Sequence, residues 1–388
     1  MTIQTHGVPP DTALTIKEFP LQTQGFLKYA AGEEVPEVND LYSAQALGTH
    51  LESLDEPPFS LIAVGDIMLG GRTRRAIKEH GDDYPFEAVL PLLQRADIIL
   101  GNLEGPFALT ARKENRNYSY RVSPKLASSL KRAGINVVTL ANNHLLDCGR
   151  AGVLETLGTL AEADIASIGA GVDEKAAHAP VILQSGPWRV GFLGYYWNQR
   201  TSATSLLPGS AMDTLDSLKD DILALREQVD RIVVTFHWGV PYEVEPSSED
   251  RAKARFAVDC GADVVVGHHP HIIQPFEIYR DCPIFYSVGN FTFGSGNSRA
   301  ESLLVGFQFE ERHTKVSVYP IYVKNRDPRV DYQPKALQGL GAERILRRLA
   351  AISGPNGSLL EIQEEHGRGT MEIPWSRRCG QGKKEPHA

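Results

Sequence analysis

The densest group of residues able to bind a metal is the run Gly267-His268-His269-Pro270-His271, which follows an apolar stretch of the chain. Imidazole nitrogens are ligands for zinc, manganese, iron, cobalt and nickel. Three neighbouring imidazoles would lose solvation free energy if they were buried without partners, which argues against a purely structural role. The run therefore predicts metal binding, and the choice among its three histidines stays open at this point.

Two carboxylates occur earlier in the chain, each at the end of an apolar run. Asp66 is flanked by glycine, and Glu104 follows Asn102 by two residues. Residues two apart project to the same side of an extended chain, so Asn102 and Glu104 can reach one site. We expect Asp66 to face a metal and Glu104 to be able to bridge two cations. The alternative is that both belong to ordinary polar turns.

Two further polar groups follow apolar runs in the same way. The cluster Ala141-Asn142-Asn143-His144 has no evident packing purpose. An asparagine oxygen suits a hard cation, and a histidine can ligate or transfer protons. His237 is followed by Trp238, which either lines a pocket or packs in the core. Glu243 lies a few residues further on and is a candidate acid or base.

Together these groups offer more oxygen and imidazole ligands than one ion needs. Such a mixed set suits two ions about 3.5–4 Å apart that share a carboxylate and a water. The sequence therefore predicts two divalent metal ions as cofactors, drawn from Mn, Zn, Fe, Ca and Mg.

Short Val- and Ile-rich runs alternate with amphipathic segments. The strands and helices that this pattern predicts must position the candidate metal ligands. We expect strands near residues 60–64, 97–100, 136–140, 190–193, 231–236, 263–266 and 284–288. We expect helices near residues 125–133, 153–163, 215–228 and 250–259. Strands alternating with helices predict a layered α/β fold with mixed sheets flanked by helices. Because ligands bind at the carboxyl ends of strands in such sheets, the polar groups that follow the strands should meet there.

The chain divides by composition into three predicted parts. Residues 1–57 are polar and proline-bearing and read as an N-terminal arm or appendage, residues 58–328 as the catalytic domain, and residues 329–388 as a helical segment with a basic tail. Within the domain, residues 303–309 and 315–323 predict an antiparallel hairpin at the sheet edge. A helix is expected near residues 342–352.

The net charge, the cysteines and the distribution of apolar residues argue against several kinds of partner and site. A net charge of -8 argues against a nucleic-acid partner, although Arg72, Arg74 and Arg75 are candidates for a local basic patch. Four widely spaced cysteines give no disulfide framework or thiolate metal site. No signal peptide or membrane-spanning run is visible, so we expect a cytoplasmic protein without a membrane partner.

Six motifs in order resemble the CapA family of poly-γ-glutamate capsule proteins, a branch of the calcineurin-like metallophosphoesterases. The resemblance covers about residues 59–325, and its motifs lie at residues 65–70, 102–106, 141–147, 237–239, 267–274 and 286–291. Two positions depart from the phosphoesterase pattern. Met68 stands where Asp-x-His is usual, and Glu104 stands where Asp is common, although both departures are typical of CapA-like proteins.

The resemblance implies roles for individual residues. It implies a calcineurin-like metallophosphoesterase fold and the metal ligands Asp66, Glu104, Asn143, His237, His269 and His271. His144 would be the catalytic acid or base, and His268 is the less favoured ligand of its cluster. We further expect substrate contacts from Asn102, Asp147, Trp238, Asn290 and Arg72.

Three functions compete on these grounds. The favoured hypothesis is a peptide epimerase similar to the soluble CapA-like enzymes of lasso-peptide biosynthesis, which would invert the Cα centre of the C-terminal residue of a precursor peptide. His144 and either His268 or Glu243 would then exchange the proton from opposite faces. The alternatives are a metal-dependent phosphoesterase or related hydrolase, and an accessory protein of poly-γ-glutamate biosynthesis.

Overall fold

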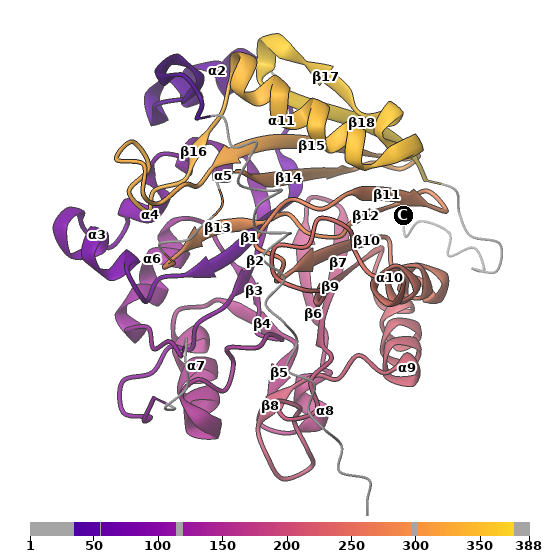
Figure 1. Ribbon diagram of the computed structural model, residues 1–388. Helices are drawn as coiled ribbons and strands as arrows, with labels where there is room; N and C mark the ends of the chain where they lie inside the picture. The colour runs from indigo at the N-terminus through magenta and orange to yellow at the C-terminus, as the bar shows by residue number, and fades with distance from the viewer. Residues whose placement is uncertain (1–34, 55, 114–118, 296–298, 300, 376–388) are drawn as a thin grey trace, which may run out of the picture. The chain divides into compact units, whose positions relative to one another are not determined.

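Two β-sheets stacked face to face dominate the computed structural model, which describes residues 35–54, 56–113, 119–295, 299 and 301–375 (Figure 1). The larger sheet has the strand order β17-β18-β15-β14-β1-β2-β3-β4, with β13 beside β1 and β16 beside β15. Its strands are β1 (Phe59–Met68), β2 (Ala96–Leu103), β3 (Val137–Thr139), β4 (Ala166–Ile168), β13 (Asn290–Phe293), β14 (Glu301–Phe309), β15 (His313–Tyr322), β16 (Lys335–Ala336), β17 (Glu361–Gln363) and β18 (Arg368–Pro374).

The second sheet has the order β11-β12-β10-β9-β7-β6. Its four central strands run parallel, and the edge strands β6 and β11 pair antiparallel. These strands are β6 (Val181–Ser185), β7 (Trp188–Tyr196), β9 (Arg231–His237), β10 (Val264–His268), β11 (Phe276–Tyr279) and β12 (Cys282–Phe285). A two-stranded ribbon of β5 (Ala170–Gly171) and β8 (Gly209–Ser210) lies apart from both sheets.

The alternation of side chains along β1 explains why the two sheets stack. Leu61 and Ala63 face the second sheet and share a buried cluster with Val233 of β9. Ile62 and Val64 face the other way, into a cluster covered by helices. A strand with both faces apolar must be covered on both sides, which gives the helix–sheet–sheet–helix layering.

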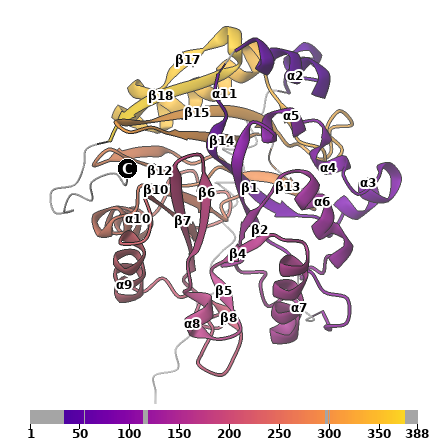
Figure 2. The same ribbon diagram turned by 180° about the vertical axis from the view of Figure 1, so that it is seen from behind.

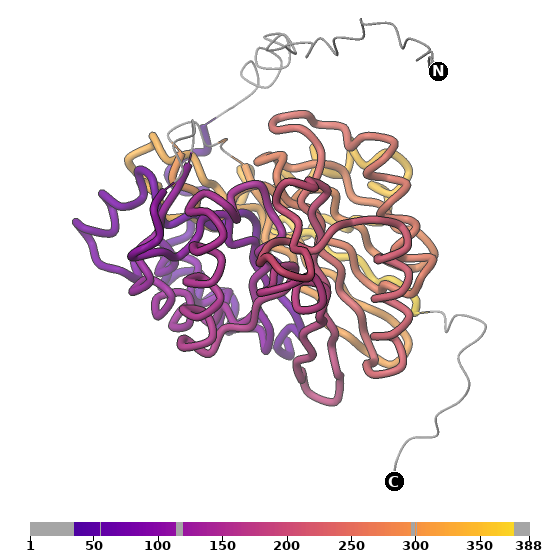
Figure 3. Tube along the Cα trace, turned by 90° about the horizontal axis from the view of Figure 1, so that it is seen from below, coloured from indigo at the N-terminus to yellow at the C-terminus, as the bar shows by residue number. Residues whose placement is uncertain are grey.

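Helices cover the outer face of each sheet. The larger sheet packs against α2 (Ala44–Ser53), α3 (Thr73–His80), α5 (Leu90–Leu93), α6 (Ala127–Arg132) and α7 (Gly149–Glu162), while the second sheet packs against α9 (Leu215–Arg226) and α10 (Ser248–Cys260). Figure 2 shows these two groups on opposite sides of the paired sheets. In Figure 3 the indigo and purple segments likewise lie on the side away from the red segments of α9 and α10.

The remaining elements are short, apart from one helix. They are η1 (Val38–Asp40), α4 (Tyr84–Glu87), η2 (Pro124–Leu126), α8 (Glu174–Ala177), η3 (Gly354–Leu359) and η4 (Glu364–His366). The exception is α11 (Gly339–Ile352), whose Ile345, Leu346 and Leu349 join the inter-sheet cluster and pack against β15 and β18.

The predicted layered α/β fold with mixed sheets flanked by helices is confirmed, and it has the layering that the resemblance to calcineurin-like metallophosphoesterases implies. Within the described residues no helix is both long and apolar enough to cross a bilayer. The three cysteines of that part form no disulfide.

Two sequence expectations about the chain's outer parts need correction. The hairpin of β14 and β15 forms, but β14 pairs with β1 and β15 with β18, so it lies inside the sheet rather than at its edge. The described part of the segment 329–388 is not a separate helical piece, because β17 and β18 extend the same sheet.

The predicted N-terminal arm is also partly built into the fold. Residues 1–34 lie outside the described residues, but Leu47 and Leu51 of α2 are buried in the core beneath the larger sheet. Leu41 forms a bridge with Leu337, so residues from 35 onward pack on the main body.

Candidate metal centre

The carboxyl ends of five strands meet at one edge of the two sheets. In the larger sheet Asp66 of β1 pairs with Asn102 of β2, and Asn102 pairs with Thr139 of β3. In the second sheet His237 of β9 pairs with His268 of β10. Because these neighbouring strands are parallel, the polar residues that end them come to one place, as the sequence predicted.

Two groups of possible metal ligands occupy this edge, and they share one carboxylate. The first consists of Asp66, Glu104 and His271, and the second of Glu104, His237 and His269. Within each group the ligand atoms lie within 4.8 Å of one another. Glu104 is fully buried and belongs to both, which is the arrangement expected of a bridging carboxylate.

The Oε1 atom of Glu104 is the focus of the site. It lies 3.8 Å from the Nε2 atoms of His144, His237 and His271, and it has no hydrogen-bond partner among the described residues. A buried carboxylate oxygen without a partner costs free energy. Metal–ligand bonds of about 2.0–2.2 Å allow two ligand atoms about 4 Å apart to share an ion. The residues present therefore fit a divalent cation at this point.

The electrostatics of the site lead to the same conclusion. Burial raises the pKa of Glu104 well above its usual range, and the neighbouring Asp66 adds to the effect. Burial lowers the pKa of His269 to about 3, with a further contribution from His271, and burial also lowers the pKa of His237. Lowered pKa values favour the neutral form of these two imidazoles, which is the form that binds a metal, and a bound cation would supply positive charge that favours ionised Glu104.

Asp66 is held in place by its neighbours. Burial alone would raise its pKa, but hydrogen bonds and charge from His268 and His271 hold that pKa well below the usual range. Asn102 donates a hydrogen bond of 2.8 Å from Nδ2 to Asp66 Oδ1 and is itself fully buried. Asn102 therefore orients the ligand Asp66. The sequence had suggested a substrate contact for Asn102, but its side chain is buried.

Asn143 lies beside the second group of ligands. Its Oδ1 atom is 3.0 Å from Nε2 of His237, so both atoms can face one ion.

The preceding residue, Asn142, was not assigned a role of its own from the sequence, although it forms hydrogen bonds between the ends of neighbouring strands. Its Nδ2 atom donates to Asn102 Oδ1 at 3.0 Å and to the carbonyl oxygen of Leu103 at 2.9 Å.

His144 faces the shared carboxylate through one nitrogen and is held through the other. Its Nδ1 atom lies 2.7 Å from Asp147 Oδ2, which also accepts the backbone N–H of Tyr120 at 2.6 Å. Asp147 is buried, so it positions His144 and does not line a substrate surface.

The ring of Tyr120 lies edge-on to His144 with 4.8 Å between centroids. Tyr120 lies in a loop far from any strand end, so no sequence signal pointed to it.

The three clustered histidines separate into different positions. His269 and His271 have φ angles of 97° and 58°, and this sharp turn places them in the two different ligand groups. His268, still in β10, is buried behind Asp66, with 3.4 Å between its Nδ1 and Asp66 Oδ1. Asn290 joins the site through its Oδ1 atom, which is 2.9 Å from Nδ1 of His271.

Three other sequence candidates lie away from the ligands. Trp238 is 2% exposed, stacks on Phe236 and donates from Nε1 to the carbonyl oxygen of Tyr286, so it is a core residue and not a pocket wall. Glu243 is exposed on the loop after β9 and belongs to neither ligand group. Arg72 is exposed beyond the end of β1 and lines a neighbouring pocket.

Met68 does not replace the histidine that the phosphoesterase pattern has at this position. Its side chain is fully buried in the cluster beneath the larger sheet. Its sulfur accepts the backbone N–H of Gly70 at 3.2 Å and packs close to Gly105. The ligand groups are accordingly built without residue 68.

Comparisons with known proteins place these motifs in a family. Residues 60–295 match the family model described as "Bacterial capsule synthesis protein PGA_cap". The "Capsule biosynthesis protein CapA" of Bacillus anthracis is 32% identical over 325 residues, which cover 79% of this chain and 78% of that protein. The "PGA biosynthesis protein CapA" of Bacillus subtilis is 28% identical over 87% of this chain and 88% of its own length. A "Probable polyglutamine synthesis accessory protein" of Mycobacterium tuberculosis is 30% identical over 59% of this chain and 64% of its own length.

Proposed function

The chain belongs to the bacterial capsule synthesis protein family, and from this premise we propose that it is a metal-dependent accessory enzyme that acts on a polyglutamate chain. The observation that carries the proposal is the position of Glu104, shared by two groups of ligands at the meeting point of the strand ends. The relatives named for capsule and polyglutamine synthesis favour this function over the epimerase hypothesis.

Two divalent cations held by these groups would supply Lewis acidity and an activated water at neutral pH. Glu104 would contact both ions, with Asp66 and His271 on one side and His237, His269 and Asn143 on the other. The chain's own residues then supply the proton that the leaving group needs. His144 directs Nε2 into the site and can protonate the leaving amine of a cleaved amide, while Asp147 fixes its tautomer through Nδ1.

The epimerase hypothesis needs an acid and a base on opposite faces of the reacting carbon. The two residues predicted to work opposite His144 are badly placed for this. His268 is buried behind Asp66, and Glu243 is exposed outside the ligand groups. Amide hydrolysis or transfer needs only one such residue beside the metals, so it matches the site better.

One experiment separates the three functions. Metal-loaded protein is incubated with defined γ-linked glutamate oligomers in water labelled with ¹⁸O and, separately, with deuterium, and an aryl phosphate ester is tested in parallel. We expect oligomers that shorten with one ¹⁸O in the new carboxylate, and loss of this reaction on chelation. Phosphate release with intact oligomers would identify a phosphoesterase, whereas deuterium at one Cα without cleavage would identify an epimerase. Either result would overturn the proposal.

A further inference from the structure

A groove lined by cationic side chains runs beside the candidate metal centre. It consists of two adjoining pockets of about 610 and 370 Å³. Arg72 and Arg326 line the larger pocket, and Arg74, Lys113 and Arg121 line the smaller one. We call these five residues the basic groove. Gly71 lines both pockets, so the two lie next to each other.

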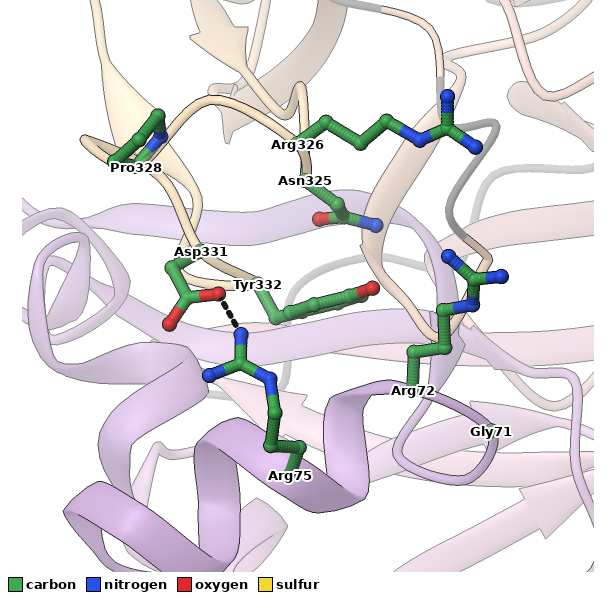
Figure 4. Close-up of a pocket in the computed structure, with 8 residues that line it drawn as sticks. All are labelled: Gly71, Arg72, Arg75, Asn325, Arg326, Pro328, Asp331 and Tyr332. Carbon is green, nitrogen blue, oxygen red and sulfur yellow. Dashed lines mark hydrogen bonds and ion pairs between the residues drawn. The ribbon is translucent and has the colours of Figure 1, made fainter.

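Four of the five cationic side chains of the basic groove are available to a ligand. The side chains of Arg72, Arg74, Lys113 and Arg121 are exposed and make no hydrogen bond or ion pair with any residue that the structure describes. Asp331 is the acidic residue lining the larger pocket, and it is paired with Arg75 (Figure 4). On a chain with a net charge of -8, such a concentration of cations points to an anionic ligand.

The larger pocket has a polar, ordered floor. Tyr332 is 5% exposed, and Figure 4 shows its ring lying across the floor with the hydroxyl directed to the side of Arg72 and Arg326. Asn325 is buried beside it and donates to the carbonyl oxygens of Phe293 and Ser295 at 2.6 and 2.8 Å. A buried phenol whose hydroxyl is directed to the side of two guanidinium groups is well suited to help them bind a carboxylate (Figure 4).

Residues that line or support the two pockets also lie close to His144 and to the metal ligand His271. Tyr120 lines the smaller pocket, and its ring is the one that lies 4.8 Å from the ring of His144. Phe293, whose carbonyl anchors the floor of the larger pocket, lies 4.6 Å from the ring of His271. The smaller pocket is therefore one ring contact away from His144, and the floor of the larger pocket is held by a residue that contacts the ligand His271.

We propose that the basic groove binds successive carboxylates of an extended anionic polymer and so guides it across the metal centre, an inference that rests on the proposed function. Cations in two joined pockets match a repeating charge better than they match a single oxyanion. Guanidinium groups bind carboxylate and phosphate alike, so the test must separate these two sources.

The test measures the affinity of the holoenzyme for fluorescent γ-linked polyglutamate, with chain length checked before and after. We compare the wild type with Arg72→Gln/Arg326→Gln and with the matched control Arg189→Gln/Lys219→Gln, which removes two exposed charges from β7 and α9. We expect the groove variant to bind about tenfold or more weakly and with a shallower salt dependence. The control should bind like the wild type, and metal content should be equal in all three.

The outcomes distinguish this inference from the proposed function. If the groove variant and the wild type bind the polymer with equal affinity, the inference that the basic groove binds it is wrong, even if the wild type cleaves the polymer. If binding depends on the groove but no metal-dependent cleavage occurs, the inference holds and the proposed function is wrong. If inorganic phosphate displaces the polymer at equal concentration, or free glutamate binds as tightly as the polymer, the ligand is a single oxyanion and the inference fails.

Discussion

Nδ1 of His144 lies 2.7 Å from Oδ2 of Asp147, within a single turn at the end of β3. Nε2 of the same imidazole points at Glu104. The dyad therefore joins the shared carboxylate of the metal centre to a buried anion, and this arrangement gives His144 a role distinct from that of the metal ligands.

Replacing His144 with Asn should lower kcat by about 10²–10⁴-fold, because a positioned acid is lost while the ligands remain. Asp147→Asn should also lower kcat by misdirecting the imidazole. Metal content, measured by elemental analysis, should be unchanged in both variants. His178 and Asp221 form a pair with the same 2.7 Å separation outside both ligand groups, so Asp221→Asn is the matched control. Loss of metal in the His144 variant would refute its assignment as acid.

Glu104→Gln should remove metal binding without disturbing the metal-free fold. Burial raises the pKa of Glu104 well above its usual range, which favours the neutral carboxyl group in the metal-free protein, and Gln has the shape of that group. Metal at about 100 times its Kd stabilises a folded protein by about 2.7 kcal/mol. Thermal unfolding with and without chelator should show this gain in the wild type and in Glu243→Gln, but not in Glu104→Gln. A metal-dependent rise in Tm in Glu104→Gln would contradict the shared-ligand assignment.

Acid sensitivity should depend on Glu56, which pairs with Arg368 and Lys315. The hydrogen bond from Arg368 is the main cause that lowers the pKa of Glu56 from 4.5 to about 2. A lowered folded-state pKa stabilises the fold above pH about 4.5, and this stability is lost as the pH falls toward 2. Glu56→Gln should therefore reduce the free energy of unfolding at pH 7 by about 2 kcal/mol, allowing for partial exposure.

Denaturant unfolding at pH 7 and near pH 2.5 checks this pair. The difference between the wild type and Glu56→Gln should shrink at the lower pH. Glu52→Gln, an exposed change on the nearby helix α2, should have no effect at either pH. A difference that persists unchanged at low pH would show that the carboxylate charge is not the cause.

Trp238→Phe should destabilise the fold and leave substrate binding intact. Phe keeps the stack on Phe236 but leaves the carbonyl oxygen of Tyr286 without its 2.9 Å hydrogen bond, which costs about 1–3 kcal/mol in a buried setting. KM for a glutamate oligomer should not change. Trp197→Phe, at a half-exposed position, is the control for stability. A raised KM with normal stability would restore Trp238 as a substrate contact.

The sequence was informative wherever a buried strand ended in a polar group. Residues such as Asp66 and Asn102 could be assigned to one edge because the parallel strands of a sheet end together. The error at Trp238 was avoidable, since side chains alternate across a strand and the residue after an inward His237 faces the opposite side.

Other features were hidden because they depend on the fold as a whole. The division of His269 and His271 between two ligand groups rests on two positive φ angles at non-glycine residues, which nothing in the local sequence announces. Tyr120 and Arg326 come from loops that only the fold brings to the site. The incorporation of β17 and β18 into the larger sheet depends on pairing with β15, not on their own short sequences.

The position of β1 inside the larger sheet also sets an order of assembly. On one side β1 pairs with β2, its neighbour in the chain, but on the other it pairs Leu61 with Phe307 and Asp66 with Asn290. In a chain emerging from the ribosome, one edge of this apolar strand thus stays unpaired until more than half of the protein has been made. The metal centre cannot form before that late pairing, so newly made chains pass through a stage in which chaperone binding and aggregation compete with completion of the sheet.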